Sequence, residues 1–267
     1  MTPEEKFVVA FNRDRDFYQV PLALNEQGLL SSLVTDLYFP FDRPVLRHIP
    51  GPARLKRRCA AGLPSAKVHW TWEALLPQLP AALLGGDRIA LFETVDRALS
   101  RAALDHAERE AAHLFLYSGY AFWAFTSERA RAMLKGLFVF HPHADLIREI
   151  LDRDLARFPE CRQSHGAEYE TSRRAAHVDE ARDEWRHADF IVCASSFTAR
   201  SLKHAGCGDG LLSVVPYGVD PAVFPFMERA RNSRIRFLFA GQGVQRKGLH
   251  HLLRARSMKG KTAGSTP

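Results

Sequence analysis

Short apolar runs recur along the chain, each bounded by glycine, proline or polar residues, at intervals of about 25 residues. Between them, apolar residues return every three or four positions, as on the buried face of a helix. The runs expected to form strands are residues 7–11, 29–37, 113–117, 136–140, 190–194, 211–215 and 235–240. Strands that alternate with helices predict an α/β fold with a Rossmann-like, doubly wound and mainly parallel sheet.

Helical spacing is clearest in the segments that link these runs. It predicts helices from residue 17 to a glycine cap at Gly28, and over 88–110, 120–133, 146–158, 164–186 and 196–203. The segment 164–186 is read as one long polar helix or two short ones. Residues 40–90 are less regular, because seven prolines interrupt them. No long element is predicted there before residue 88.

Composition and charge narrow the class of protein and of partner. The formal net charge of +7 favours anionic partners such as nucleotides, phosphorylated substrates or acidic lipid surfaces. Nucleic acid is not expected as a partner, because the charge is diffuse and no known binding module is visible. The four cysteines lack CxxC spacing, which fits free thiols in a reducing cytoplasm better than a zinc or disulfide framework. The polar N-terminus and the lack of a long apolar stretch predict neither a signal peptide nor a transmembrane helix.

The carboxyl ends of parallel strands are where an open α/β sheet carries its working residues. This rule nominates the residues that directly follow the predicted strands. They are Ser118-Gly119-Tyr120, His141-Pro142-His143, Ser195-Ser196, Tyr217-Gly218 and the segment Gly241 to Gly248.

The segment Gly241 to Gly248 combines a glycine-rich turn with two cations, Arg246 and Lys247, before a helical pattern. Free backbone N–H groups and the helix dipole suit such a turn to an anion. It is not a dinucleotide fingerprint, since Arg246 stands at the third glycine position, and it is not a P-loop, since Leu249 stands where lysine is required. The alternatives are a diphosphate-binding turn and a plain glycine turn with two solvated cations.

Three motifs in a fixed order distinguish these alternatives. They are Ala188-Asp-Phe-Ile-Val-Cys-Ala-Ser-Ser-Phe197, Val214-Val-Pro-Tyr-Gly-Val-Asp220 and Phe239-Ala-Gly-Gln-Gly-Val-Gln-Arg-Lys-Gly248. The series resembles the retaining GT-B glycosyltransferases of family 4, closely over residues 188–255 and loosely elsewhere. In that family the motifs mark the last β-α unit of the first domain, the hinge, and the start of the nucleotide-sugar-binding domain.

The resemblance implies roles for individual residues. Arg246 and Lys247 would hold the donor diphosphate, Lys247 being the better match, while Gly241 and Gly243 would let the backbone approach the phosphates. His141 would be the catalytic-site histidine facing the sugar, with His143 as its alternative. The acceptor and donor cleft would include Ser118, Gly119, Tyr120 and Gly218. The donor is a nucleoside-diphosphate sugar, and the family pattern requires no cofactor or metal.

The same resemblance divides the chain. Residues 1–220 would be the acceptor-side domain, 221–233 a linker, 234–255 the first β-α unit of a truncated donor-binding domain, and 256–267 a disordered tail. The acidic E-x7-E motif and the rest of the donor domain do not follow Ala255, so the chain is expected to be an impaired enzyme.

Two rival hypotheses stay open at this stage. One is a non-catalytic interaction or acceptor-binding module derived from a glycosyltransferase. The other is a different Rossmann-like enzyme such as a methyltransferase, although no glycine-rich turn follows the first strand. The acceptor is unknown: a saccharide, a lipid or a small molecule. The basic run 54–58 and the nearby Trp70 and Trp72 leave room for peripheral membrane contact, with a solvated basic face as the alternative.

Overall fold

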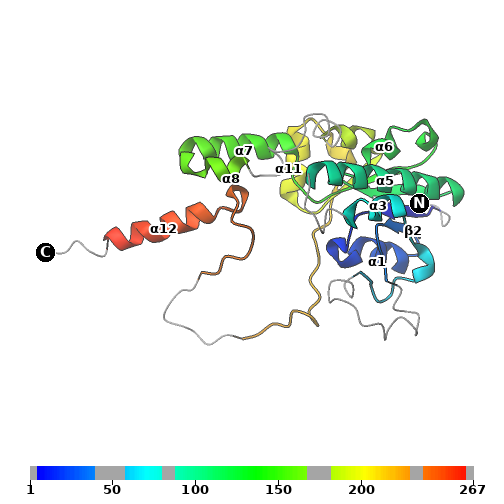
Figure 1. The fold of residues 1–267 in the computed structure, drawn as a ribbon, viewed down its shortest axis with the longest axis horizontal. Coiled ribbons are helices and arrows are strands. Elements are labelled where there is room, and N and C mark those ends of the chain that lie inside the picture. The colour runs from blue at the N-terminus through cyan, green and yellow to red at the C-terminus, as the bar shows by residue number, and fades with distance from the viewer. Residues whose placement is uncertain (1–4, 40–57, 80–87, 167–181, 229–236, 263–267) are drawn as a thin grey trace. The chain divides into compact units, whose positions relative to one another are not determined.

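The computed structural model describes residues 5–39, 58–79, 88–166, 182–228 and 237–262 (Figure 1). It divides into two compact units. The first comprises residues 1–142 and 174–215, and the second comprises residues 143–173 and 216–267. This division differs from the expected one, because residues 143–173 group with the C-terminal segment and not with the sheet.

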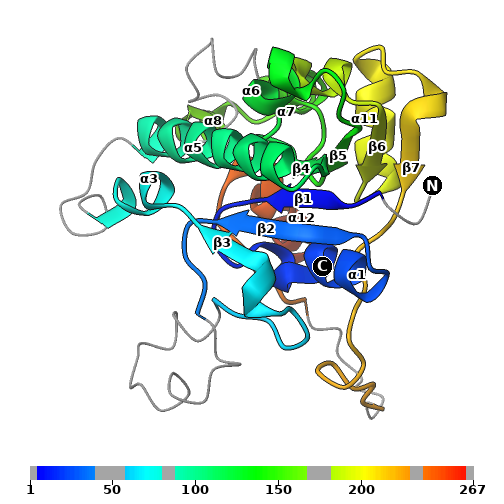
Figure 2. The same ribbon diagram turned by 90° about the vertical axis from the view of Figure 1, so that its right-hand side faces the viewer.

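The first unit is built on one seven-stranded sheet in which every pair of neighbouring strands is parallel. Its spatial order is β3-β2-β1-β4-β5-β6-β7 (Figure 2). The strands are β1 (Phe7–Ala10), β2 (Leu30–Thr35), β3 (Val68–Trp70), β4 (His113–Tyr117), β5 (Lys135–Val139), β6 (Phe190–Cys193) and β7 (Leu212–Val214). The predicted Rossmann-like, doubly wound α/β fold is confirmed.

Helices cover both faces of this sheet. Helix α1 (Gln19–Glu26) lies on one face, and α5 (Arg88–Arg109) lies on the other beside the short α6 (Phe122–Phe125) (Figure 2). Helix α11 (Ser196–His204) follows β6, and the Ser195 side chain caps it by accepting a hydrogen bond from the Thr198 N–H at 3.1 Å. Because both faces are covered, the central strands are apolar throughout, which is why they stand out as continuous runs in the sequence.

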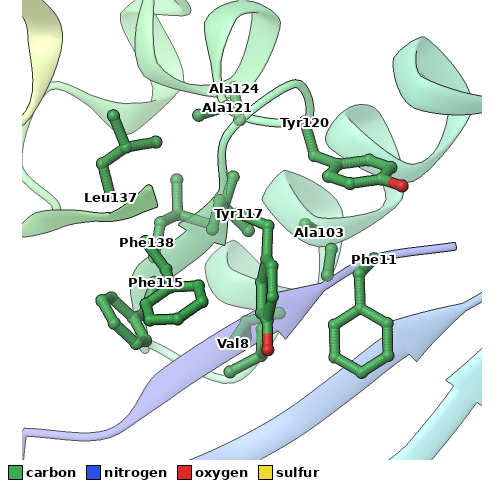
Figure 3. Packing of buried hydrophobic residues seen from close by; sticks show 14 of the residues in the cluster. Val8, Phe11, Ala103, Phe115, Tyr117, Tyr120, Ala121, Ala124, Leu137 and Phe138 are labelled. Carbon is green, nitrogen blue, oxygen red and sulfur yellow. The ribbon is translucent and has the colours of Figure 1, made fainter. Parts of the chain in front are cut away.

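Aromatic rings fill much of the core that packs on the sheet (Figure 3). The Tyr117 ring packs between those of Phe11 and Phe138, with centroid distances of 5.0 and 4.8 Å. In the same core, the rings of Phe115 and Phe190 stack over Gly136 of β5 with their centroids 5.7 Å apart. Only a residue without a side chain fits at that position of β5.

The structure differs from the sequence prediction at two places, and a third prediction falls mostly outside the described residues. The helix expected over 120–133 is replaced by α6 and a separate 3-10 turn over Glu128–Ala130, because the Ser127 side chain accepts the Arg129 N–H and starts a new turn. Strand β3 was not predicted. The helix expected over 164–186 lies mostly outside the described residues, with α8 (Arg162–Gly166) and a 3-10 turn, η6 (Glu184–His187), at its two ends.

The second unit consists of α7 (Ala144–Arg157), the 3-10 turn η5 (Pro159–Cys161), α8, the 3-10 turn η8 (Gln245–Lys247) and α12 (Leu249–Thr262). Residues 237–240 form no strand, contrary to prediction, since the described part of this unit offers no strand to pair with. Helix α12 continues to Thr262, so residues 256–262 are helical and not the predicted disordered tail. Of the β-α unit predicted at 234–255, the described residues form the helix but not the strand.

Candidate functional site

The candidate site of the first unit lies where the strand order of the sheet reverses. Strand β1 has β2 on one side and β4 on the other, so the loops that leave β1 and β4 diverge at their carboxyl ends. Open α/β sheets bind ligands in the crevice at such a switch point. The loop after β1 begins at Phe11, and the loop after β4 contains Ser118, Gly119 and Tyr120.

The loop after β1 has an unusual backbone. Arg13, Asp16, Phe17 and Tyr18 all have positive φ angles, between 51° and 69°, although none is glycine. Each such residue costs about 1–3 kcal/mol and persists only where its surroundings hold it. Strain of this kind concentrates at functional sites, which favours this loop as part of one.

The buried carboxylate of Asp36, which follows β2, holds this loop by a hydrogen bond to its backbone. Its Oδ1 accepts a hydrogen bond from the Arg13 N–H at 2.9 Å and pairs with the Arg58 guanidinium at 2.7 Å. Its Oδ1 also accepts from the Thr35 hydroxyl at 3.2 Å, and its Oδ2 accepts from the Gln78 side chain at 3.1 Å. Asp36 is therefore fully engaged as a structural anchor.

Arg15 is the cation that this loop brings to the carboxyl edge of the sheet. Its Nη2 donates to the Tyr120 hydroxyl at 3.3 Å, and its guanidinium lies 4.4 Å from the centre of the Phe140 ring. Burial opposes its charge, but the Tyr120 oxygen and the carboxylates of Asp16 and Asp96 outweigh burial and raise the pKa of Arg15. Its buried Nε has no hydrogen-bond acceptor among the described residues, so this N–H can serve an anionic ligand.

The Ser118-Gly119 turn is held by a buried carboxylate from a distant part of the chain. Glu184, in η6, accepts a hydrogen bond from the Ser118 hydroxyl at 2.6 Å through Oε1. The Gly119 N–H donates to both carboxylate oxygens, at 2.9 and 3.0 Å. Gly119 has a φ of 96°, which favours glycine at this position. The predicted residues Ser118, Gly119 and Tyr120 thus form one rigid turn beside Arg15.

The two predicted histidines differ in their surroundings. His141 follows β5, is exposed, and packs its ring against Phe140 at a centroid distance of 4.1 Å. His143 belongs to the second unit, where its buried ring caps α7 and its Nδ1 accepts the Asp145 N–H at 3.4 Å. His141 therefore offers the more accessible ring, while His143 has a structural task.

In the second unit, the predicted anion-binding residues lie around η8. Arg246 and Lys247 are exposed in this 3-10 turn, Gly241 and Gly243 precede it, and Gly248 ends it with a φ of 70°. The two cations are therefore one short turn before α12 and not in its first turn. Gly218 is exposed near the start of the later of the two segments that make up this unit.

Gln245 fixes this turn, and the sequence did not single it out. Its buried side chain donates through Nε2 to the Asp154 carboxylate at 2.7 Å and to the Leu151 carbonyl at 3.2 Å. Its backbone N–H donates to the Ser164 hydroxyl at 2.8 Å. The turn that carries Arg246 and Lys247 is thereby fastened to α7 and α8.

The Asp154 carboxylate also contacts the rings of His250 and His251, and the Nε2 of each ring lies 2.9 Å from a carboxylate oxygen. Burial alone would raise the pKa of Asp154, but the hydrogen bond from Gln245 and the two neighbouring histidines hold this pKa below its ordinary value. Asp154 therefore stabilises the packing of η8 and α12 on α7 in its charged form.

We expect Asp154→Asn to lower the hydrogen-exchange protection of the amides of residues 245–252 by about tenfold at pH 7, the effect of a lost charge-assisted hydrogen bond. Because the folded-state pKa is depressed, the contribution is complete above about pH 4 and is lost as the pH falls through the folded-state value. The difference between variant and wild type should therefore shrink in acid. Glu149→Gln, an exposed position on α7, is the matched control, and equal protection at pH 7 would contradict the assignment.

A separate hollow of about 400 Å³ opens along α5 and faces α3 (Trp72–Leu75). Its lining mixes both signs of charge: Glu73, Ala90, Glu93, Thr94, Arg97, Ala98 and Arg101. None of the predicted site residues lines it. No helix among the described residues is long and apolar enough to cross a membrane.

Comparison with known proteins identifies no relative of this chain. No protein-family model, no curated protein and no solved structure matches the chain.

Proposed function

We propose that the chain is a GT-B, family 4-like glycosyltransferase that uses a nucleoside-diphosphate sugar and transfers the sugar with retention. The observation that carries the proposal is the fixed order of the three motifs along the chain, of which the first two meet the last two strands of the sheet. The first motif forms β6 and the start of α11, the second leaves β7, and the third forms the turn before α12. A Rossmann-like sheet alone would not suffice, since many unrelated activities share it.

The geometry of the first unit supports a role in substrate binding. A rigid Ser118-Gly119 turn, the Tyr120 hydroxyl and the Arg15 guanidinium converge at the carboxyl edge of the sheet. Hydroxyl and guanidinium groups suit the polar groups of a saccharide or of an anionic acceptor. In this proposal His141, exposed at the end of β5, hydrogen-bonds a sugar hydroxyl.

In the second unit, the exposed Arg246 and Lys247 would bind the donor diphosphate. Gln245 restrains their turn, so less ordering is needed when the phosphates bind. Cations held near a leaving diphosphate would also stabilise the charge that develops as the glycosidic bond breaks. Neither a cofactor nor a metal is required by this proposal.

Isothermal titration calorimetry with UDP, GDP and ADP tests the diphosphate role. We expect at least one of them to bind, and Lys247→Ala to weaken that binding about tenfold or more, the effect of one charge-assisted contact. Lys203→Ala is the matched control, since this exposed lysine of α11 pairs only with Asp209 among the described residues. Equal affinity in the wild type and in Lys247→Ala would exclude the role.

A second candidate function is a non-catalytic interaction module. It is favoured by the large apolar side chains that the second unit exposes outside its helices, namely Phe224 (71%), Phe226 (94%), Met227 (76%), Phe237 (75%) and Leu238 (92%). Groups of such side chains mark surfaces that another protein part covers. Failure of all three nucleotides to bind the wild-type chain would favour this module over the transferase.

The setting of the reaction is part of the proposal. The four cysteines are free, which fits a reducing, cytoplasmic compartment. Trp70 and Trp72 pack their rings at 4.6 Å and stay 42% and 58% exposed, as aromatic residues do at a membrane surface. We therefore include peripheral contact with a membrane, without any contact with nucleic acid.

A further inference from the structure

We infer that His69, His106 and Glu110 form a binding site for a divalent transition metal of the zinc class. The three side chains come from β3, from α5 and from the residue that directly follows α5. Their ligand atoms all lie within 4.8 Å of one another. This cluster takes no part in the glycosyltransferase proposal, and the inference does not depend on it.

One carboxylate oxygen is the centre of the cluster. Oε1 of Glu110 lies 3.0 Å from Nδ1 of His106 and 4.0 Å from Nε2 of His69. Ligand atoms around a tetrahedral zinc ion with bonds of 2.0–2.1 Å are about 3.4 Å apart. The two distances bracket this value, so an ion would need side-chain movements of about an ångström or less.

A hydrogen bond from outside the cluster orients the carboxylate. The Ser31 hydroxyl donates to Oε2 of Glu110 at 2.7 Å, which leaves Oε1 turned toward the two imidazoles. His106 and Glu110 are four positions apart and stay on one face of the helix, since the Glu110 N–H donates to the His106 carbonyl at 2.9 Å. Second-shell contacts of this kind are typical of metal ligands.

The two histidines are arranged as ligands more than as an ion pair. A salt bridge to Glu110 needs one imidazole, yet the His69 ring stacks on that of His106 with centroids 4.3 Å apart. The side chains of His69 and Glu110 stay 40% and 28% exposed, which leaves a fourth position open to water.

The cluster joins β3 to the end of α5 and contains no residue of the Ser118-Gly119 turn. Glu110 lies three positions before His113, where β4 begins, whereas Ser118 follows the other end of that strand. A bound ion would join the edge strand β3, which is three residues long, to the end of α5. Its first effect would therefore be to stabilise this edge of the first unit.

A second group of potential ligands, Asp154, His250 and His251, provides an internal comparison. Both oxygens of Asp154 already contact a histidine, and Oδ2 also accepts the Gln245 hydrogen bond. Because Gln245 occupies one of the two carboxylate oxygens, we assign this group a structural role. A variant of this second group therefore serves as a control for zinc binding by histidines outside the proposed site.

Calorimetric titration of the EDTA-treated full chain with zinc chloride tests the site. We expect one ion to bind with micromolar or tighter affinity, and a hundredfold excess of zinc over its Kd to raise the Tm by about 5–10 °C. His69→Ala and Glu110→Gln should each weaken binding at least tenfold, and Ser31→Ala should weaken it about tenfold through the second shell. His251→Ala should bind zinc as the wild type does.

Circular dichroism and metal-free melting of each variant show whether it has folded. Because Glu110→Gln keeps the size and the Ser31 contact of the side chain, it tests the site even if His69→Ala unfolds. No zinc binding by the wild type would overturn the inference. Unchanged affinity in Glu110→Gln, or loss of binding in His251→Ala alone, would overturn it as well.

Discussion

Gly136→Ala is expected to lower the free energy of unfolding of the first unit by about 3 kcal/mol or more, the upper range for overpacking a core. A methyl group at this position of β5 would lie 2.2 Å from Cζ of Phe190 and 2.5 Å from Cδ2 of Phe115. Both rings belong to a packed aromatic cluster that includes Phe7. They cannot withdraw without disturbing β1 and β6, and urea unfolding followed by circular dichroism would measure the loss.

Two further variants separate this clash from a general effect of replacing glycine. Gly210→Ala is the matched control, because its new methyl group meets nothing within 4 Å and its φ is not positive, so its stability should stay close to that of the wild type. Phe190→Leu removes Cζ, and in the Gly136→Ala background it should restore part of the lost stability. If Gly136→Ala alone lies within about 0.5 kcal/mol of the wild type, the packing described for β5 is wrong.

The central strands could be predicted because burial on both faces leaves a signal in the sequence itself. Residues 113–117, a run that ends at Ser118 and Gly119, coincide with β4. Strand β3 left no such signal, since its three residues, Val68–Trp70, follow a proline-rich segment and one of its faces is partly exposed. Its pairing is determined by the free edge of β2, which lies in another part of the sequence.

The same contrast holds for the candidate site. The rule that working residues follow parallel strands nominated Ser118, Gly119 and Tyr120, and the structure brings them together in one turn. The residues that hold this turn and the turn in the second unit, Glu184 and Gln245, were missed. Each acts through contacts 65 to 94 positions away in the sequence, and no local pattern records such contacts.

Arg15 was missed for a different reason. The segment after the first strand was considered only for the glycine-rich turn of a methyltransferase, which it lacks. Its position after the first strand of an open α/β sheet was a usable signal, because that loop borders the switch point whatever its composition. The left-handed backbone of Arg13 could not be foreseen, since its N–H is held by the tertiary contact with Asp36.

Glu184→Ala is expected to lower the free energy of unfolding by about 3 kcal/mol and to release the Ser118-Gly119 turn. The substitution leaves the Gly119 N–H and the Ser118 hydroxyl without their acceptor, and an unsatisfied buried group costs about 1–3 kcal/mol. Glu184 itself is 2% exposed, so water cannot replace the carboxylate unless the turn opens. Urea unfolding measures the stability, and hydrogen exchange of the Gly119 amide reports on the turn.

Matched variants decide whether the effect arises from this turn. Glu184→Gln keeps an acceptor oxygen and the shape of the side chain, so it should lose less stability than Glu184→Ala. Glu108→Ala removes an exposed carboxylate of α5 that pairs with Arg129, and it should leave the unfolding midpoint nearly unchanged. In a double-mutant cycle, Ser118→Ala and Glu184→Ala should be strongly non-additive, because both remove the same bond. Additive effects would mean that Glu184 stabilises the fold by other contacts, and the rigid turn would then lose its place in the proposed substrate site.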